Sequence, residues 1–484
     1  MMLHRSLVRS ISCASKMTRW LVAVMLVLAS MLSANVQAQP ASSTPNMHDA
    51  VDLPQGFDRA ASSHTLLGDV YAQDMAAIRA HAWDVWAGLS APSGSATSDG
   101  QMLPVWETWF SATEVFDDRY ARDTEPTAHR PVRHDLEIPL QSQHHVVPGR
   151  SAAVMSFVKF NPPAAQFIWD ERLYLRQTLN GLQGRFDAVD APVEERQIKP
   201  FPRDAVVLKV VFWLIKSADS RQSQDGLTAL PYWDPDDPPP PDGQTPTHLT
   251  WSHCVAVDPT NRRSGSTASI TCNGRPAMAS VVNLDDFYHY RLGTPEDVAQ
   301  ARKFMAILSG VGHEQERFVT NEQQVPELDD HIALVAMHVT TKEIENWTFQ
   351  TFWWSPSPDL PPFGDDRPDR VVGPWRHYAM CAAYSMVTPR LPDLSPHRCF
   401  NPFLETDLGP TASYQIAGQT YPPDPMAGTR SNCMNCHMRA AWGSTPPANP
   451  ANTGFIPPND PSLAGKVKTD FMWSLLFHSQ PPGG

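Results

Sequence analysis

The chain of 484 residues has few long apolar segments and no excess of basic residues. A membrane-spanning helix needs about 20 consecutive apolar residues. The apolar run at 21–34 has only fourteen, and no later stretch comes close to a span. The net charge of −13 argues against nucleic acid or an anionic membrane as partner. No repeat with a period between 20 and 50 residues is present, which excludes solenoids and propellers.

Several common catalytic motifs are also missing. No glycine-rich phosphate loop, serine elbow or nucleotide fingerprint follows a predicted strand. His313-Glu314 begins like a zinc-protease helix, but Arg317 stands where the second histidine is required. The sequence therefore excludes these catalytic classes in their usual form.

The N-terminal residues have the organisation of a secretory signal peptide. A basic region precedes the apolar run 21–34, and the small or modest-sized residues Val36-Gln37-Ala38 suit cleavage before Gln39. We therefore predict a signal peptide at 1–38, export to the periplasm and no membrane span after cleavage. A start at Met17 would give a shorter signal. Cleavage removes four basic and no acidic residues, so the net charge would fall to −17.

The segment Cys433-Met434-Asn435-Cys436-His437 is a C-x-x-C-H motif, the attachment site of a c-type haem. Thiols at this spacing form thioethers with the two vinyl groups of one porphyrin, and the histidine becomes the proximal iron ligand. A redox dithiol and half of a zinc site are the alternatives. A zinc site needs two more Cys or His ligands, and none lies within twenty residues. The motif thus predicts one covalent haem.

Four further cysteines, Cys254, Cys272, Cys381 and Cys399, would remain in an oxidising compartment. Four cysteines allow three pairings. The first two and the last two are each separated by 18 residues, so the two local pairs are the favoured disulfides. Buried free thiols are the alternative.

The apolar patterns predict an α+β protein with a β-rich body. Strands are expected at 152–160, 205–216, 278–284, 332–340 and 347–354, which are rich in Val, Phe, Ile and Trp. Helices are expected at 70–89, after the Asn161 N-cap with an apolar face continuing to Leu182, and after Thr294. With 47 prolines, several of them clustered, long proline-rich loops should connect these elements.

The position of the motif bears on the fold. Only 47 residues follow His437, too few to enclose a porphyrin by themselves. We therefore expect a body at 39–430 and a haem-attachment segment at 431–484 that packs on it. This differs from small helical class I cytochromes c, in which the motif lies near the N-terminus.

The chain resembles c-type cytochromes in its haem motif and export signal. The strings LVAMHVTTKEIENWTFQTFWW (334–354), SNCMNCHMRAAW (431–442) and KTDFMWSL (468–475) are similar to those of large secreted bacterial proteins of the cytochrome c family. The resemblance implies haem binding and electron transfer, and it carries over the functional residues Cys433, Cys436 and His437.

The sixth iron ligand determines whether a haem carries electrons or also binds small molecules. His338, inside an apolar strand, and Met472, near the C-terminus, are the distal candidates; His377 and Met380 come next. A buried structural role is the alternative for each. Arg439 and Arg376 are candidates to pair with the haem propionates, with a solvated role as the alternative.

We therefore expect a periplasmic monohaem c-type cytochrome that exchanges electrons with a redox partner protein. A haem enzyme of peroxidase or oxygenase type, with an open distal site, is the alternative. A haem-based sensor or binding protein is a further alternative.

Overall fold

The computed structural model describes residue 53 and the ranges 63–97, 100–117, 154–237, 248, 250–308, 325–384, 398–405, 414–416, 419–421, 433–443 and 459–481. The predicted signal peptide at 1–38, the prolines at 238–241 and the motif at 313–317 lie outside these residues. The chain divides into two compact units, 1–47 and 48–484, and all described residues belong to the second.

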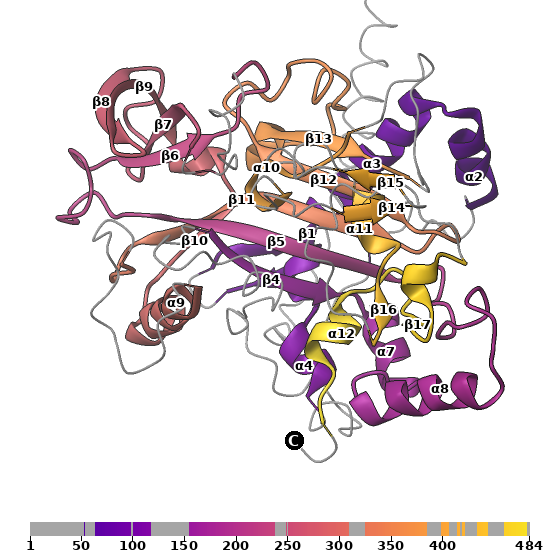
Figure 1. The fold of residues 1–484 in the computed structure, drawn as a ribbon. Helices are drawn as coiled ribbons and strands as arrows, with labels where there is room; N and C mark the ends of the chain where they lie inside the picture. Colours follow the sequence, from indigo (N-terminus) through magenta and orange to yellow (C-terminus); the bar gives the residue numbers. More distant parts are fainter. Residues whose placement is uncertain are drawn as a thin grey trace, which may run out of the picture. The chain divides into compact units, whose positions relative to one another are not determined.

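The second unit is built on a seven-stranded antiparallel sheet (Figure 1). Its strand order is β13-β12-β11-β5-β4-β3, with β10 paired to one end of β11. Both faces of β5 and β11 are covered, which explains why these strands are almost continuously apolar. The bounds are β3 Phe110–Ser111, β4 Val154–Phe160, β5 Val206–Ile215, β10 His289–Arg291, β11 His331–Thr341, β12 Thr348–Trp354 and β13 Tyr378–Ala382.

A second sheet has four strands in the order β6-β7-β9-β8: β6 Thr228–Tyr232, β7 His253–Asp258, β8 Thr267–Cys272 and β9 Arg275–Asn283. Strands β7 and β9 are parallel, and the other pairs are antiparallel. Among the described residues, three two-stranded ladders complete the strands: β1 Pro92–Ala96 with β2 Met102–Pro104, β14 Tyr414–Ile416 with β15 Gln419–Tyr421, and β16 Ala441–Trp442 with β17 Val467–Lys468. The five strands predicted from the sequence are confirmed.

The helix predicted after Thr294 is confirmed, whereas the other two predicted helices are each divided into two shorter ones. The described helices are α2 Ser63–Ala72, α3 Met75–Ser90, α4 Ala112–Phe116, α7 Pro162–Asp170, α8 Arg176–Ala188, α9 Pro295–Leu308, α10 Pro402–Glu405, α11 Cys433–His437 and α12 Ser474–His478, with 3-10 turns η1 Val105–Thr108, η2 Leu284–Asp286, η4 Gly373–His377 and η6 Pro461–Leu463. The prediction of one helix at 70–89 was wrong, because Gln73 adopts a left-handed φ of 56° and Asp74 caps a new helix. Asn161 caps α7 as predicted. However, Arg172 is left-handed, so the apolar face is divided between α7 and α8.

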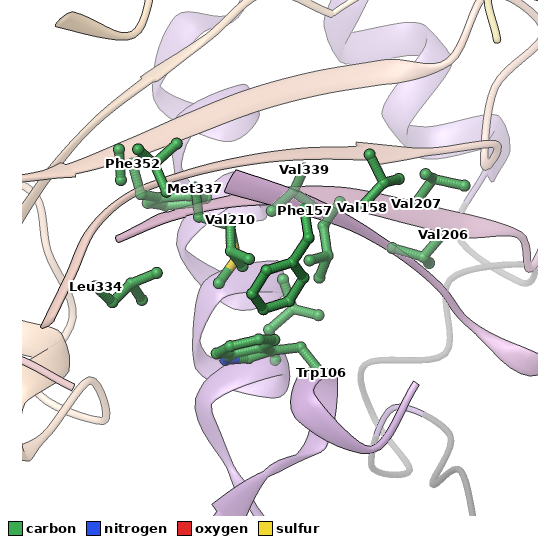
Figure 2. Packing of buried hydrophobic residues seen from close by; sticks show 14 of the residues in the cluster. Trp106, Phe157, Val158, Val206, Val207, Val210, Leu334, Met337, Val339 and Phe352 are labelled. Atoms are coloured by element: carbon green, nitrogen blue, oxygen red, sulfur yellow. The ribbon is translucent and has the colours of Figure 1, made fainter. Parts of the chain in front are cut away.

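The two faces of the large sheet differ in chemistry. Phe157 and Val210 point toward Trp106 in the main apolar core (Figure 2). On the opposite face, cross-strand pairing places Lys209, His338 and Thr351 side by side. These three residues are here called the polar row. Because side chains alternate along a strand, Met337 and His338 point to opposite faces.

The described residues thus form a β-rich α+β protein with antiparallel sheets and short helices, not a small helical fold. None of the described helices combines the length and the hydropathy needed to cross a bilayer.

Candidate functional site

The C-x-x-C-H motif forms the short helix α11, which lies against β12 (Figure 1). Residues three and four apart share one side of a helix, so Cys433, Cys436 and His437 belong to the same side. Cys433 and Cys436 are free thiols and are not bonded to each other. Burial raises the pKa of both, that of Cys436 to about 12, with the negative charge of Glu405 adding to the effect. An attacking redox dithiol needs a lowered thiol pKa, so this environment does not match that alternative.

The imidazole of His437 is oriented by the C-terminal residues. Its Nδ1 lies 2.7 Å from the carbonyl oxygen of Phe471, and its ring centroid lies 4.7 Å from that of Phe349 on β12. Burial lowers the pKa of His437 to about 4, with the Phe471 carbonyl opposing, so the ring is neutral at pH 7. A neutral imidazole that donates Nδ1–H to a carbonyl presents Nε2 to a metal.

The turn that supplies this carbonyl has unusual backbone. Asp470 and Phe471 are both left-handed, with φ of 48° and 66°. Each such residue that is not glycine costs about 1–3 kcal/mol, and such strain persists only where surrounding contacts hold it. Two residues further on, Trp473 Nε1 donates to the carbonyl of Cys436 at 3.2 Å. The turn therefore contacts α11 both at the His437 ring and at the helix backbone.

The polar row lies close to α11. His338 Nε2 and Glu405 Oε1 are 2.5 Å apart, and their side chains keep 19% and 16% of their surface exposed. Burial lowers the pKa of Lys209 to about 8, and the charges of Glu405 and Cys436 oppose that shift. The charges of Lys209, Glu405 and His338 also act on His437. Titratable groups from β5, β11, α10 and α11 therefore meet on one face of the sheet.

Glu405 is placed by its own short segment. Asn401 Nδ2 donates to Thr351 Oγ1 at 2.7 Å and to the Phe352 carbonyl at 3.1 Å, which fixes α10 on the sheet. The backbone N–H of Asn401 donates to Glu405 Oε2. Asn401 thus links Thr351, at one end of the polar row, to the Glu405 carboxylate that binds His338.

Both predicted disulfides are confirmed: Cys254–Cys272 and Cys381–Cys399. The first joins β7 to β8 in the four-stranded sheet. The second joins β13 to the residues just before α10, and Cys433 Sγ lies 3.6 Å from the carbonyl oxygen of Cys399. The second disulfide therefore borders the motif, a relationship that the sequence did not indicate.

The candidates for the distal iron ligand lie in different parts of the structure. His338 is in the polar row, on the sheet face that α11 approaches. Met472 is buried in the main core, 3% exposed, within the turn that orients His437. His377 Nε2 lies 3.6 Å from Asp286 Oδ1, at the far end of β13. Met380 pairs with Phe352 and lies on the face opposite the polar row.

The two arginines proposed to pair with the haem propionates also lie in different environments. Arg439 lies two residues after His437 and is buried, with 8% of its surface exposed. Its positive charge lowers the pKa of Cys436 against the larger effect of burial. The solvated role considered for Arg439 is therefore wrong. Arg376 is exposed and donates to the carbonyl of Val371.

Sequence reasoning missed three titratable residues in or around the polar row: Lys209, Glu405 and His478. Lys209 comes close to the motif through its register with His338, which requires knowledge of the strand order. His478, in α12, packs its ring 5.4 Å from that of Phe116. Burial lowers its pKa to about 4, and the charge of Lys209 contributes. Of the three residues, only His478 had a sequence signal, which was its place near the end of an apolar segment.

Within the described ranges, no group of three or more His, Cys, Asp or Glu side chains is arranged to hold a metal ion. The two free thiols and the oriented, neutral imidazole nevertheless fit a covalently attached haem, whose iron takes one protein nitrogen on its proximal side. Comparison of the chain with protein-family models, with curated proteins and with solved structures found no match.

Proposed function

We propose that this chain is an exported monohaem c-type protein that transfers electrons. Cys433 and Cys436 would hold the porphyrin by thioether bonds, and His437 Nε2 would bind the iron. The observation that carries the proposal is the C-x-x-C-H motif on one helical turn, with free thiols and with His437 Nδ1 at 2.7 Å from the Phe471 carbonyl. When bound, the haem supplies one-electron oxidation and reduction.

The chain's own residues have separate tasks in this proposal. The Phe471 carbonyl accepts a hydrogen bond from Nδ1–H, fixes the tautomer and makes the imidazole a stronger electron donor. Phe349 packs against the His437 ring and restricts its rotation. Trp473 anchors the backbone of α11 through Cys436.

The proposed location is the periplasm. The basic and apolar N-terminal segment supports export. The two disulfides are typical of an oxidising compartment, where haem attachment of this type also takes place. The proposed partner is a redox protein, and the net negative charge of the chain would favour a basic docking surface on it.

The second candidate function is a haem enzyme with an open distal side. The partly exposed His338–Glu405 pair, with Lys209 beside it, favours this candidate, because small-molecule haem chemistry uses acid–base groups near the iron. A ferric absorption spectrum separates the two candidates. A six-coordinate low-spin spectrum supports electron transfer alone, and a high-spin spectrum supports an enzyme.

The proposal is tested by expressing the full chain together with a c-type haem ligation system. We expect a mass increase equal to one porphyrin, a pyridine haemochrome spectrum of a doubly linked haem and a reversible one-electron titration. Cys433→Ser and Cys436→Ser should each leave a singly linked haem with a shifted haemochrome spectrum. As a matched control, replacing both Cys254 and Cys272 with Ser removes two cysteines outside the motif and should leave the spectrum unchanged. A colourless mature protein, or one with zinc on these thiols, would refute the proposal.

A further inference from the structure

The carbonyl that orients His437 belongs to a strained backbone segment. Asp470 and Phe471 are consecutive left-handed residues, and neither is glycine. The Phe471 carbonyl oxygen points at His437 Nδ1 only while this conformation persists. Other contacts must therefore hold the two residues in place.

The Asp470 side chain provides those contacts. Its Oδ1 accepts from Lys342 Nζ at 2.6 Å, and its Oδ2 accepts from the backbone N–H of Phe201 at 2.9 Å. Lys342 Nζ also donates to the carbonyl of Glu345 at 2.6 Å and lies 5.4 Å from the ring centre of Trp347. The Lys342 and Asp470 side chains are only 3% and 11% exposed. Both carboxylate oxygens are thus engaged, one by Lys342 directly after β11 and the other by Phe201 in the segment that precedes β5.

The C-terminal segment is docked independently of this ion pair. The N–H of Thr469 donates to the Ala440 carbonyl, and the N–H of Ile198 donates to the Lys468 carbonyl, both at 3.0 Å. Arg176 Nε donates to the carbonyl of Ser479 at 2.7 Å. Loss of the ion pair should therefore loosen the turn at 470–471 without detaching the segment.

We propose that Asp470 and Lys342 are positioning residues that lower the reduction potential of the haem by holding the Phe471 carbonyl on His437 Nδ1. This inference depends on the proposed function, because it requires a haem iron on His437. A hydrogen bond to Nδ1 increases electron donation from the imidazole, which favours the oxidised iron. When the carbonyl is free to move away, His437 donates less electron density to the iron, and the reduced form becomes more stable relative to the oxidised form.

The test is a redox titration of the holoprotein, combined with resonance Raman measurement of the iron–histidine stretch in the five-coordinate ferrous state, reached by photolysis of the carbon monoxide adduct. Asp470→Ala removes both side-chain contacts and disfavours the left-handed backbone. We expect the ratio of reduced to oxidised protein at a fixed ambient potential to rise about tenfold, equivalent to ~59 mV for one electron. The iron–histidine stretch should move to lower frequency. Asp470→Asn should give intermediate values of both signals, because asparagine tolerates the left-handed region and still accepts from Phe201 but loses the charge that binds Lys342.

A matched control is Asp329→Ala. Asp329 is also a left-handed aspartate, with φ of 70°, and it pairs with Arg291 at the opposite end of β11. This variant removes the same chemical features away from α11, so its potential and Raman signal should equal those of the wild type.

Haem content is measured first, so that the two proposals fail separately. A wild-type chain without haem refutes the proposed function. A haem-loaded Asp470→Ala variant with the wild-type potential and stretch refutes the positioning role. Should that variant not fold, Lys342→Met breaks the ion pair without changing the backbone preference of residue 470, and an unchanged potential there refutes the positioning role equally.

Discussion

His338 in β11 is hydrogen bonded to Glu405 in α10, with 2.5 Å between Nε2 and Oε1. The two residues are 67 positions apart, and the contact exists because Asn401 fixes α10 on Thr351 and Phe352. The carboxylate engages one imidazole nitrogen and so sets the orientation of the ring. The orientation of the His338 ring in the polar row beside α11 thus depends on the carboxylate that α10 supplies.

The coupling between His338 and Glu405 is testable with a double-mutant cycle of His338→Gln and Glu405→Gln. A hydrogen bond that involves a charged group contributes about 1.5–3 kcal/mol, and partial exposure of both side chains should reduce this. We therefore expect a coupling energy of about 1 kcal/mol in urea unfolding. Haem content should not change. Additive effects of the two substitutions would mean that the pair does not interact in solution.

The chemistry of the motif could be predicted from the sequence because its residues are adjacent along the chain. The strands β5 and β11 were also predictable, since burial on both faces leaves long apolar runs. The local disulfides followed from their equal separations. The polar row was not predictable, because Lys209 and His338 are neighbours only through the strand order, and Glu405 reaches them through a separate helix.

The helix boundaries show a second reason for the limits of sequence reasoning. The apolar spacing at 70–89 continues through Gln73, but the left-handed φ of that residue ends α2. Left-handed residues at Asp470 and Phe471 likewise determine which carbonyl meets His437. None of these positions is glycine, so the sequence carried no sign of the turn. Tertiary contacts select such conformations.

The two disulfides allow a direct comparison, because each closes a loop of 18 residues. Replacing both cysteines of either pair with serine should lower the free energy of unfolding by about 3 kcal/mol in the chain-entropy model. Only the loss of Cys381–Cys399 should also alter the haem spectrum, because that disulfide borders Cys433 and holds the segment of Glu405. Identical haem spectra in the two variants would show that the Cys381–Cys399 disulfide does not influence the haem site.

Acid should destabilise the protein partly through His331. Burial lowers its pKa from 6.5 to about 4, and the charges of His289 and Arg291 add to the effect. Between these values the unfolded chain binds a proton that the folded protein does not, so stability falls as the pH drops through this window. His331→Gln should remove part of that fall in urea unfolding between about pH 7 and about pH 4.

The control for this pH effect is the wild-type chain, unfolded in urea at the same pH values. If His331→Gln retained the full wild-type loss of stability at low pH, other groups would account for the acid sensitivity.

The buried hydroxyl of Tyr384 lies 2.6 Å from Nδ1 of His81, whose Nε2 is 3.0 Å from Glu343 Oε2. Tyr384→Phe leaves an imidazole nitrogen without this partner in the core, which should cost about 1–3 kcal/mol in thermal or urea unfolding. Tyr378→Phe is the matched control, because that buried hydroxyl donates to the Leu334 carbonyl at 2.7 Å. An under-satisfied carbonyl is better tolerated than an orphaned ring nitrogen, so the control should cost less. Equal costs would mean that His81 finds another partner, and that the contact with Tyr384 does not determine the orientation of its ring.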